Sequence, residues 1–488
     1  MSKSPSILLR TDSYKASHHL AYPPGLENFQ ASLEPRVGGR YPKTLFFGLT
    51  PALLDLAETI TGQDVDEAKA FWAAHGEPFD ADSWYNIAER LDGRLPLSVR
   101  SVPEGTLLPQ GCVPFVVTAT QPGYAWLVTH VETVLSRVWY TSTVATRSFY
   151  CKKVLYDYLR RTSDLDADNA VLFKLHDFGA RGVSSSTEAS LGGMAHLLNF
   201  RGTDTVEGIC AARRYYGGGT DMYGFSIPAL EHSTVIAWGK DREEECYLNF
   251  VAKCAAKGYK MVACVSDSYD FRNAVSNIWC RPDVVKKVKD LGVTVVIRPD
   301  SGDAVQENLF AANEIAKKVG STVNSKSYTV LDPVYRLIQG DGNNDESDID
   351  RVCHAFRLNG LSTENIAFGM GAGLLRKVDR DVQRFAYKPT AAKIDGKWVH
   401  ISKNPATDPS KKSKGGLLDV LVGPDGDYVT VNEDVALTGP EADTNDLWDN
   451  LDYKSVLETR FHDGFIYGTS SFQDIRKRAE EAFTKEVE

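Results

Sequence analysis

The chain has 488 residues, 42% hydrophobic and 25% charged, a composition typical of a soluble globular protein with about two or three domains. The formal net charge of −10 argues against a broad basic surface for nucleic acid or an anionic membrane. The stretch MSKSPSILLRTDSYK has too short an apolar core for a secretory signal, and no apolar run approaches the length of a membrane span. We therefore expect a cytoplasmic protein without a membrane or nucleic-acid partner.

The eight cysteines form no CxxC pair and no His/Cys cluster at zinc spacing. Several lie inside apolar runs such as MVACV (261–265). We expect buried, reduced thiols of the kind found in cytosolic proteins.

The two flanks of the chain mix short strands with helices. Residues 1–150 contain strand-like LFFGL, LPLSVRSV and FVVTAT and the helical stretches PALLDLAETI and AWLVTHVETVLSRVWYTS. Residues 386–488 contain strand-like KWVHISK, DVLVGP and DYVTVN. We interpret the flanks as two parts of one smaller α+β domain.

Residues 151–385 repeat one design and are predicted to form an α/β domain with an irregular or partial β/α barrel. Apolar or β-branched runs that stop at Asp, Gly or Ser occur in VLFKLHDFG (171–179), MVACVSDSYD (261–270), VTVVIRPDSGD (293–303), YRLIQGDG (335–342) and NIAFGMGAG (365–373). Helix-like stretches such as QENLFAANEIAKKVG lie between several of them, as in a parallel sheet covered by helices. Functional loops follow the C-terminal strand ends in such folds, so these polar endings are expected at one mouth.

Acids, arginines and glycines gather at these strand ends: Asp177, Asp267, Asp300, Asp341, Arg181, Arg298 and the stretches IQGDG (338–342) and GMGAG (369–373). Carboxylates can accept from ribose hydroxyls or hold Mg²⁺ directly or through water, and arginine offers a planar fork to phosphate. Glycine lets backbone N–H groups approach a phosphate closely. Together these residues predict a site for a phosphorylated sugar and a metal, although each alone is also typical of a helix cap or turn.

His232 follows Glu231 in ALEHSTVIAW, and the adjacent acid could orient the ring and make it nucleophilic. Taken by itself, however, such a residue is by default a structural histidine, and orientation by Glu231 is the alternative. His18, His19 and His176 lack such a neighbour, and we interpret them as structural.

Several motifs together resemble the nicotinamide phosphoribosyltransferase family: TDSYK (11–15), KLHDFGARGVSS (174–185), NFRGTDT (199–205), EHSTVIAWGKD (231–241), VSDSYD (265–270), IRPDSGD (297–303), IQGDG and NIAFG (365–369). They follow the family's order and cover nearly the whole chain. The resemblance implies a homodimer of the type II phosphoribosyltransferase fold. Such an enzyme converts nicotinamide and phosphoribosyl pyrophosphate (PRPP) to nicotinamide mononucleotide (NMN) and pyrophosphate in NAD salvage, with Mg²⁺ as cofactor and ATP as activating co-substrate.

The resemblance also implies roles for single residues. Phe178 matches the ring that stacks on nicotinamide, Tyr14 of the partner subunit the ring on the opposite face, and Asp204 the acceptor of the carboxamide NH₂. The catalytic set is His232, Asp267, Asp300 and Arg298, with Asp267 and Asp300 near the metal, directly or through water. Arg298 lies near the amide oxygen and a phosphate, and His232 matches the histidine that ATP phosphorylates. The ribose and 5′-phosphate side is matched by Asp300, Gly340, Asp341, Gly371 and Ala372, and the pyrophosphate side by Arg181, Asp267 and His232 with Arg36, Arg380, Lys388, Lys403 and Lys411 of the partner subunit.

Two positions depart from the family pattern. Ala386 stands where the family usually has serine, which removes one hydroxyl contact to pyrophosphate. Ala372 replaces a usual glycine in GMGAG and tightens the pocket.

Three other functions are weighed against this one. An Asp204 carboxylate accepts from an amide but repels nicotinate, which opposes a nicotinate-preferring phosphoribosyltransferase of the same fold. The intact set of acids and arginines opposes a non-catalytic nucleotide-sensing homologue. A phosphosugar aldolase or isomerase would need a Schiff-base lysine or an enolising acid–base pair, and the sequence indicates neither.

Overall fold

The computed structural model describes residues 5–403, 407, 413–432 and 453–488, and the chain divides into two compact units. The first unit, built from both chain ends, comprises Met1–Thr146, Tyr215–Gly218 and Asp379–Ala482. The second comprises Arg147–Arg214, Gly219–Val378 and Phe483–Glu488. The two units are of similar length, which differs from the smaller end-built domain that the sequence suggested. Within the described ranges, no helix is both long and apolar enough to cross a membrane.

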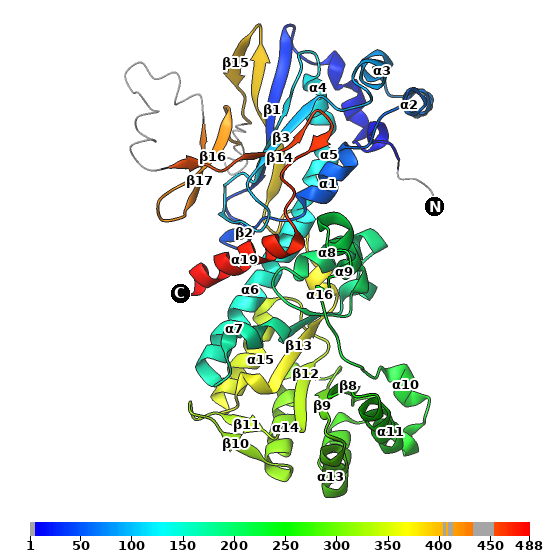
Figure 1. Cartoon of the computed structure of the whole chain (residues 1–488), viewed down its shortest axis with the longest axis vertical. Coiled ribbons are helices and arrows are strands. Elements are labelled where there is room, and N and C mark those ends of the chain that lie inside the picture. Colours follow the sequence, from blue (N-terminus) through cyan, green and yellow to red (C-terminus); the bar gives the residue numbers. More distant parts are fainter. Residues whose placement is uncertain (1–4, 404–406, 408–412, 433–452) are drawn as a thin grey trace. The chain divides into compact units, whose positions relative to one another are not determined.

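The first unit is an α+β structure around a seven-stranded sheet of order β15-β14-β1-β5-β3-β19-β20 (Figure 1). β1 pairs antiparallel with β5 and with β14, which joins the two ends of the chain in one sheet. The strands of the whole first unit are β1 (Leu26–Pro35), β2 (Lys43–Leu45), β3 (Leu97–Ser101), β4 (Leu107–Pro109), β5 (Phe115–Ala119), β14 (Phe385–Ile394), β15 (Lys397–His400), β16 (Leu418–Val422), β17 (Tyr428–Asn432), β18 (Lys454–Ser455), β19 (Glu458–His462) and β20 (Phe465–Ile466). Its helices are α1 (Leu49–Leu56), α2 (Gly62–His75), α3 (Ala81–Arg90), α4 (Ala125–His130) and α5 (Glu132–Ser136).

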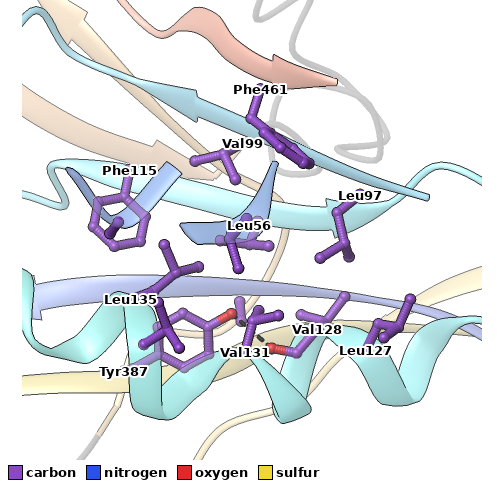
Figure 2. Close-up of a cluster of buried hydrophobic side chains, with 14 of the residues drawn as sticks. Leu56, Leu97, Val99, Phe115, Leu127, Val128, Val131, Leu135, Tyr387 and Phe461 are labelled. Atoms are coloured by element: carbon purple, nitrogen blue, oxygen red, sulfur yellow. Dashed lines mark hydrogen bonds between the residues drawn. The ribbon is translucent and has the colours of Figure 1, made fainter. Parts of the chain in front are cut away.

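The core of the first unit lies between this sheet and its helices. Figure 2 shows Phe115 and Val99 on the sheet facing Leu135 and Val131, and all four side chains are buried. The Tyr387 hydroxyl donates to the Val128 carbonyl oxygen at 2.7 Å, which satisfies the one polar atom of that ring within the apolar cluster.

The second unit contains a six-stranded parallel sheet of order β7-β6-β13-β12-β9-β8 (Figure 1). The strands are β6 (Leu175–Asp177), β7 (Gly202–Thr203), β8 (Met261–Val265), β9 (Thr294–Arg298), β12 (Tyr335–Gln339) and β13 (Ile366–Met370), with a separate hairpin of β10 (Ser321–Val323) and β11 (Thr329–Leu331). The helices are α7 (Ala167–Ala170), α8 (Ser186–His196), α10 (His232–Ile236), α11 (Glu243–Ala256), α12 (Phe271–Asn273), α13 (Pro282–Leu291), α14 (Ala304–Lys318), α15 (Glu346–Leu358) and α16 (Ala372–Leu375), while α6 (Val138–Thr162), α9 (Val206–Tyr216) and α19 (Phe472–Val487) run across the division between the units.

The five predicted strand segments form five adjacent strands of this sheet, which confirms the α/β fold class. The first of them is shorter than expected, because residues Val171–Phe173 close α7 with a 3₁₀ turn and the strand begins only at Leu175. Helices between the strands carry strong end signals. Pro282 opens α13 and Gly292 ends it in the left-handed conformation, and the Asp303 carboxylate caps α14 by accepting from the Gln306 N–H.

A short segment closes the curled sheet into an irregular barrel. Phe225 forms a parallel bridge with Gly202 in β7, and Ala229 forms one with Ala263 in β8. β7 and β8 are the two edges of the six-stranded sheet, so residues 225–229 take the place of a seventh strand. The inward-facing residues Ala263, Val296 and Ile338 make a small apolar cluster of their own.

We expect Phe115→Ala to lower the free energy of unfolding of the first unit by about 3–5 kcal/mol, because it removes a fully buried ring. Calorimetry should show a clearly lower unfolding midpoint. Leu54→Ala on α1, where the side chain is exposed, is the control and should change that midpoint little. Equal effects of the two substitutions would contradict the placement of this core.

Candidate functional site

The polar residues at the strand ends lie along one edge of the parallel sheet. Asp177 ends β6, Gly371 follows β13 and Gly340 follows β12, while Asp300 and Asp267 follow β9 and β8. These strands are neighbours and run parallel, so their C-terminal ends meet at the same edge. The structure thus brings these predicted residues to one mouth of the barrel.

A cavity of about 420 Å³ occupies the interior of this barrel. Its lining includes three predicted residues, Phe178, Asp204 and Arg298. Barrel interiors are usually filled by large branched side chains. Here Ala263 and Ala367 line the cavity, and their small side chains help to leave the interior open.

The Phe178 ring lies directly on Gly369 of β13. A Cβ at Gly369 would come within 2.1 Å of the ring atom Cε2, so a side chain at this position would force the ring to move. The Phe178 N–H donates to the Met370 carbonyl oxygen at 3.0 Å, which fixes the backbone that carries the ring. The ring therefore forms part of the cavity wall, and the stacking role that the resemblance implies for it stays a prediction.

His232, Asp267 and Asp300 form a cluster at the C-terminal strand ends. The His232 Nε2 atom lies 3.7 Å from Asp267 Oδ1 and 3.4 Å from Asp300 Oδ2, and Nδ1 lies 3.1 Å from the Ser268 hydroxyl. The expectation that Glu231 orients the ring is therefore wrong. The Glu231 carboxylate accepts from Ser233 and caps α10, which turns it toward its own helix.

Arg298 and Gly340 lie against the same cluster. The Arg298 Nε atom is 3.7 Å from Asp300 Oδ1, and a Cβ at Gly340 would come within 2.1 Å of that oxygen. Gly340 therefore allows close contact between neighbouring strand ends. Ala372, one of the departures from the family pattern, is accommodated in a similar way, because a Cβ at Gly182 would lie 2.9 Å from the Ala372 Cβ. Arg181, three residues after Phe178, and Asp341, directly after Gly340, are both exposed and do not line the cavity.

Asp267 and Asp300 could supply some, but not all, of the six oxygen ligands that Mg²⁺ needs. Asp267 Oδ2 accepts from the Asp300 N–H and the Ser301 hydroxyl, whereas Asp267 Oδ1 is buried without a hydrogen-bond partner. No group of three His, Cys, Asp or Glu residues in the described ranges is arranged to hold a metal. The residues present fit Mg²⁺ held by one or two carboxylates, with water and substrate oxygens completing its shell.

Sequence reasoning missed two side chains that hold the glycine-rich loops together. The Asn343 amide donates to the Gly369 carbonyl oxygen at 2.9 Å, and the Gln339 amide donates to the Asp341 carbonyl oxygen at 2.6 Å. Both side chains are buried. The one available signal was that Gln339 belongs to IQGDG and Asn343 follows it directly. His176, which we interpreted as structural, also lines the cavity.

The residues predicted to act from a partner subunit belong to the first unit: Tyr14, Arg36, Arg380, Lys388 and Lys403, while Lys411 lies outside the described residues. Tyr14 is 58% exposed. Glu132 connects two segments of this set, because its carboxylate lies 2.7 Å from the Lys15 ammonium and 3.6 Å from that of Lys388.

Asp177 is a fully buried acid behind the cavity wall. Its Oδ1 accepts from the Gly179 N–H at 2.7 Å, which fixes the turn after Phe178. Burial raises the pKa of the Asp177 carboxyl to about 7. The acid thus positions the turn and does not reach the cavity.

The raised pKa gives a test by pH. The pKa of Asp177 is about 7 in the folded protein and about 4 in the unfolded chain, so between these values the folded protein holds a proton that the unfolded chain has lost. The free energy of unfolding therefore falls by roughly 1.4 kcal/mol for each pH unit as pH rises through this range. Asparagine cannot ionise, so Asp177→Asn escapes this loss. The unfolding midpoint of the variant minus that of wild type should therefore be larger at pH 8 than at pH 5. Asp290→Asn on the exposed face of α13 is the control. A difference from wild type that stays constant with pH would contradict the assignment.

Comparison with known proteins identifies the family of the chain. A model of the nicotinate phosphoribosyltransferase (NAPRTase) family matches residues 173–476, and one of the nicotinamide phosphoribosyltransferase N-terminal domain matches residues 6–99. The chain is 46% identical to a nicotinamide phosphoribosyltransferase of Xanthomonas campestris over 85% of this chain and 87% of the relative. It is 31% identical to one of Acinetobacter baylyi, over 85% and 88%.

Two crystal structures share the fold. A nicotinate-nucleotide pyrophosphorylase from Pyrococcus furiosus aligns with a TM-score of 0.62 at 15% identity, covering 99% of this chain and 97% of that one. A human nicotinic acid phosphoribosyltransferase aligns with a TM-score of 0.55 at 17% identity, covering 97% and 93%. By sequence the chain belongs to the NAPRTase family and, within it, to the nicotinamide phosphoribosyltransferases.

Proposed function

We propose that this protein transfers the phosphoribosyl group of PRPP to nicotinamide, forming NMN and pyrophosphate in NAD salvage. The observation that carries the proposal is the barrel cavity, which the Phe178 ring, packed against Gly369, lines together with Asp204 and Arg298. A flat apolar wall suits a pyridine ring. An acceptor and a cationic donor on the same lining suit the NH₂ and C=O groups of a carboxamide.

The strand ends beside this cavity suit the phosphorylated sugar. We assign the 5′-phosphate and ribose to Asp300, Gly340, Asp341, Gly371 and Ala372, and the pyrophosphate to Arg181, Asp267, His232 and Arg298. Glycine at 340 and 371 lets backbone N–H groups come close to phosphate oxygens. Arg298 both lines the cavity and contacts Asp300, so it lies where base and sugar would meet.

The reaction needs alignment more than proton transfer. The ring nitrogen of nicotinamide is uncharged and has a free lone pair, so no general base is required. It forms a bond to the sugar C1 while the bond from C1 to the pyrophosphate oxygen breaks and its electrons leave with pyrophosphate. The residues at the mouth hold the two reactants in line and stabilise charge on the leaving group.

Asp267 and Asp300 would hold Mg²⁺, with the unpartnered Asp267 Oδ1 as one ligand atom. When bound, the ion would neutralise charge on the pyrophosphate. We further propose a cytoplasmic homodimer in which the partner subunit supplies Tyr14 over the second face of the base. Arg36, Arg380, Lys388, Lys403 and Lys411 would come from that partner and contact the pyrophosphate.

Base preference tests the assignment directly. We expect purified protein to release pyrophosphate from PRPP with nicotinamide far better than with nicotinate, because the Asp204 carboxylate accepts from an amide and repels a carboxylate. Asp204→Asn should narrow this preference by at least about tenfold in the ratio of kcat/KM values, since asparagine removes the charge that repels nicotinate and can donate from its NH₂ to the nicotinate carboxylate. Asp290→Asn is the control. A variant that excludes nicotinate as fully as wild type would refute the role of Asp204, and a wild type that prefers nicotinate would favour the alternative enzyme of the same fold.

ATP stimulation tests the role of His232. We propose that ATP phosphorylates this ring, which faces the acids of the candidate pyrophosphate site. ATP should label wild-type protein at His232 and lower the apparent KM for PRPP, and both effects should be absent in His232→Ala. His354→Ala, at an exposed position on α15, should keep both. An unchanged ATP response in His232→Ala would remove this role and leave the transferase assignment intact.

A further inference from the structure

Ser226 lies beside Asp204 because the segment that closes the barrel has a fixed register. The Phe225 N–H donates to the Arg201 carbonyl oxygen at 2.7 Å, and the Thr203 N–H donates to the Phe225 carbonyl oxygen at 3.0 Å. This parallel bridge pairs Phe225 with Gly202, so Ser226 lies level with Thr203, the residue directly before Asp204. Ser226 and Asp204 both line the barrel cavity.

The hydrogen bond between these two side chains has only one possible direction. The Ser226 hydroxyl donates to Asp204 Oδ1, since an ionised carboxylate can only accept. A hydroxyl has one proton and two lone pairs, so this bond leaves the Ser226 oxygen only lone pairs for a ligand. The Asp204 backbone is held independently, because its N–H donates to the Asp177 carbonyl oxygen at 2.9 Å.

We propose that Ser226 is a second base-specificity residue, whose oxygen accepts from the carboxamide NH₂ beside Asp204. This inference rests on the proposed function and extends it. An amide nitrogen carries two hydrogens, and Asp204 with Ser226 offers an acceptor for each. A carboxylate in the same place would meet two acceptors and donate to neither.

Three basic side chains on the cavity lining, those of Lys174, Arg336 and His176, do not reverse the preference for nicotinamide over nicotinate. The Lys174 ammonium donates to the carbonyl oxygens of Glu364 and Ile366 at 2.8 and 3.0 Å, and the Arg336 guanidinium donates to three backbone carbonyls. Burial lowers the pKa of His176, which favours its neutral ring. Arg298 remains the donor suited to the carboxamide oxygen, so the lining distinguishes the two ends of the amide.

The test is the ratio of kcat/KM for nicotinamide to that for nicotinate, with PRPP as co-substrate. We expect Ser226→Ala to lower this ratio about three- to tenfold, because one acceptor is lost, while KM for PRPP stays near the wild-type value. Ser226→Thr keeps the hydroxyl and should keep most of the preference. Ser186→Ala is a matched control, because the Ser186 hydroxyl donates to the Glu207 carboxylate away from the cavity lining.

The outcomes separate this inference from the proposed function. If Asp204→Asn changes the base ratio and Ser226→Ala does not, the role of Ser226 is overturned and the function stands. If Ser226→Ala lowers kcat/KM equally for nicotinamide and nicotinate and also raises KM for PRPP, Ser226 is a structural residue and the inference is overturned. A wild-type protein that releases no pyrophosphate with either base would overturn the proposed function and this inference with it.

Discussion

The contact between the Phe178 ring and the backbone of Gly369 is the constraint on which the candidate site depends. It requires β6 and β13 to pair in the observed parallel register, in which His176 lies opposite Gly369. With the ring fixed there, the turn that Asp177 holds leads the chain to Arg181, three residues after Phe178. The Gly369 carbonyl also receives the Asn343 amide, so the loop after β12 is positioned by the same glycine. A side chain at residue 369 would therefore disturb both the Phe178 ring and the loop after β12.

Much of this arrangement could be predicted from the sequence, because parallel strands have a strong local signature. Apolar runs that end at polar residues indicate buried strands, and the common direction of parallel strands places Asp267, Asp300 and Gly340 at one edge without knowledge of their contacts. The partners of single side chains could not be predicted in this way. Ser226 meets Asp204 through a bridge that lies outside the named strands, and His232 turns to Ser268 from another loop rather than to its neighbour Glu231. Such contacts depend on the register of segments distant in sequence, which local patterns do not specify.

Asp177 illustrates how site geometry and stability oppose each other. A buried carboxyl with one unpartnered oxygen destabilises the fold at neutral pH, and asparagine would offer the same acceptor without a charge. A charged acceptor, however, makes a stronger hydrogen bond to the Gly179 N–H than a neutral one does. Once Asp177 is ionised, it therefore holds the turn after Phe178 through a stronger hydrogen bond than asparagine could make. Local rules of folding are commonly broken at functional sites in this manner.

The charges at the barrel mouth place a further requirement on any anionic substrate. Asp267 and Asp300 both approach the same nitrogen of His232, so two carboxylates face the region assigned to pyrophosphate. Alone they would repel that group, and Arg298 is already within 3.7 Å of Asp300. Pyrophosphate can be held here only if more positive charge is added, which is the contribution expected of Mg²⁺ and of the lysines and arginines assigned to a partner subunit. The cavity that we assign to the base has no such requirement, because nicotinamide is neutral and much of the cavity lining is apolar. Binding of the sugar phosphate should therefore depend strongly on metal and ionic strength, whereas recognition of the base depends on the shape and hydrogen bonds of the cavity.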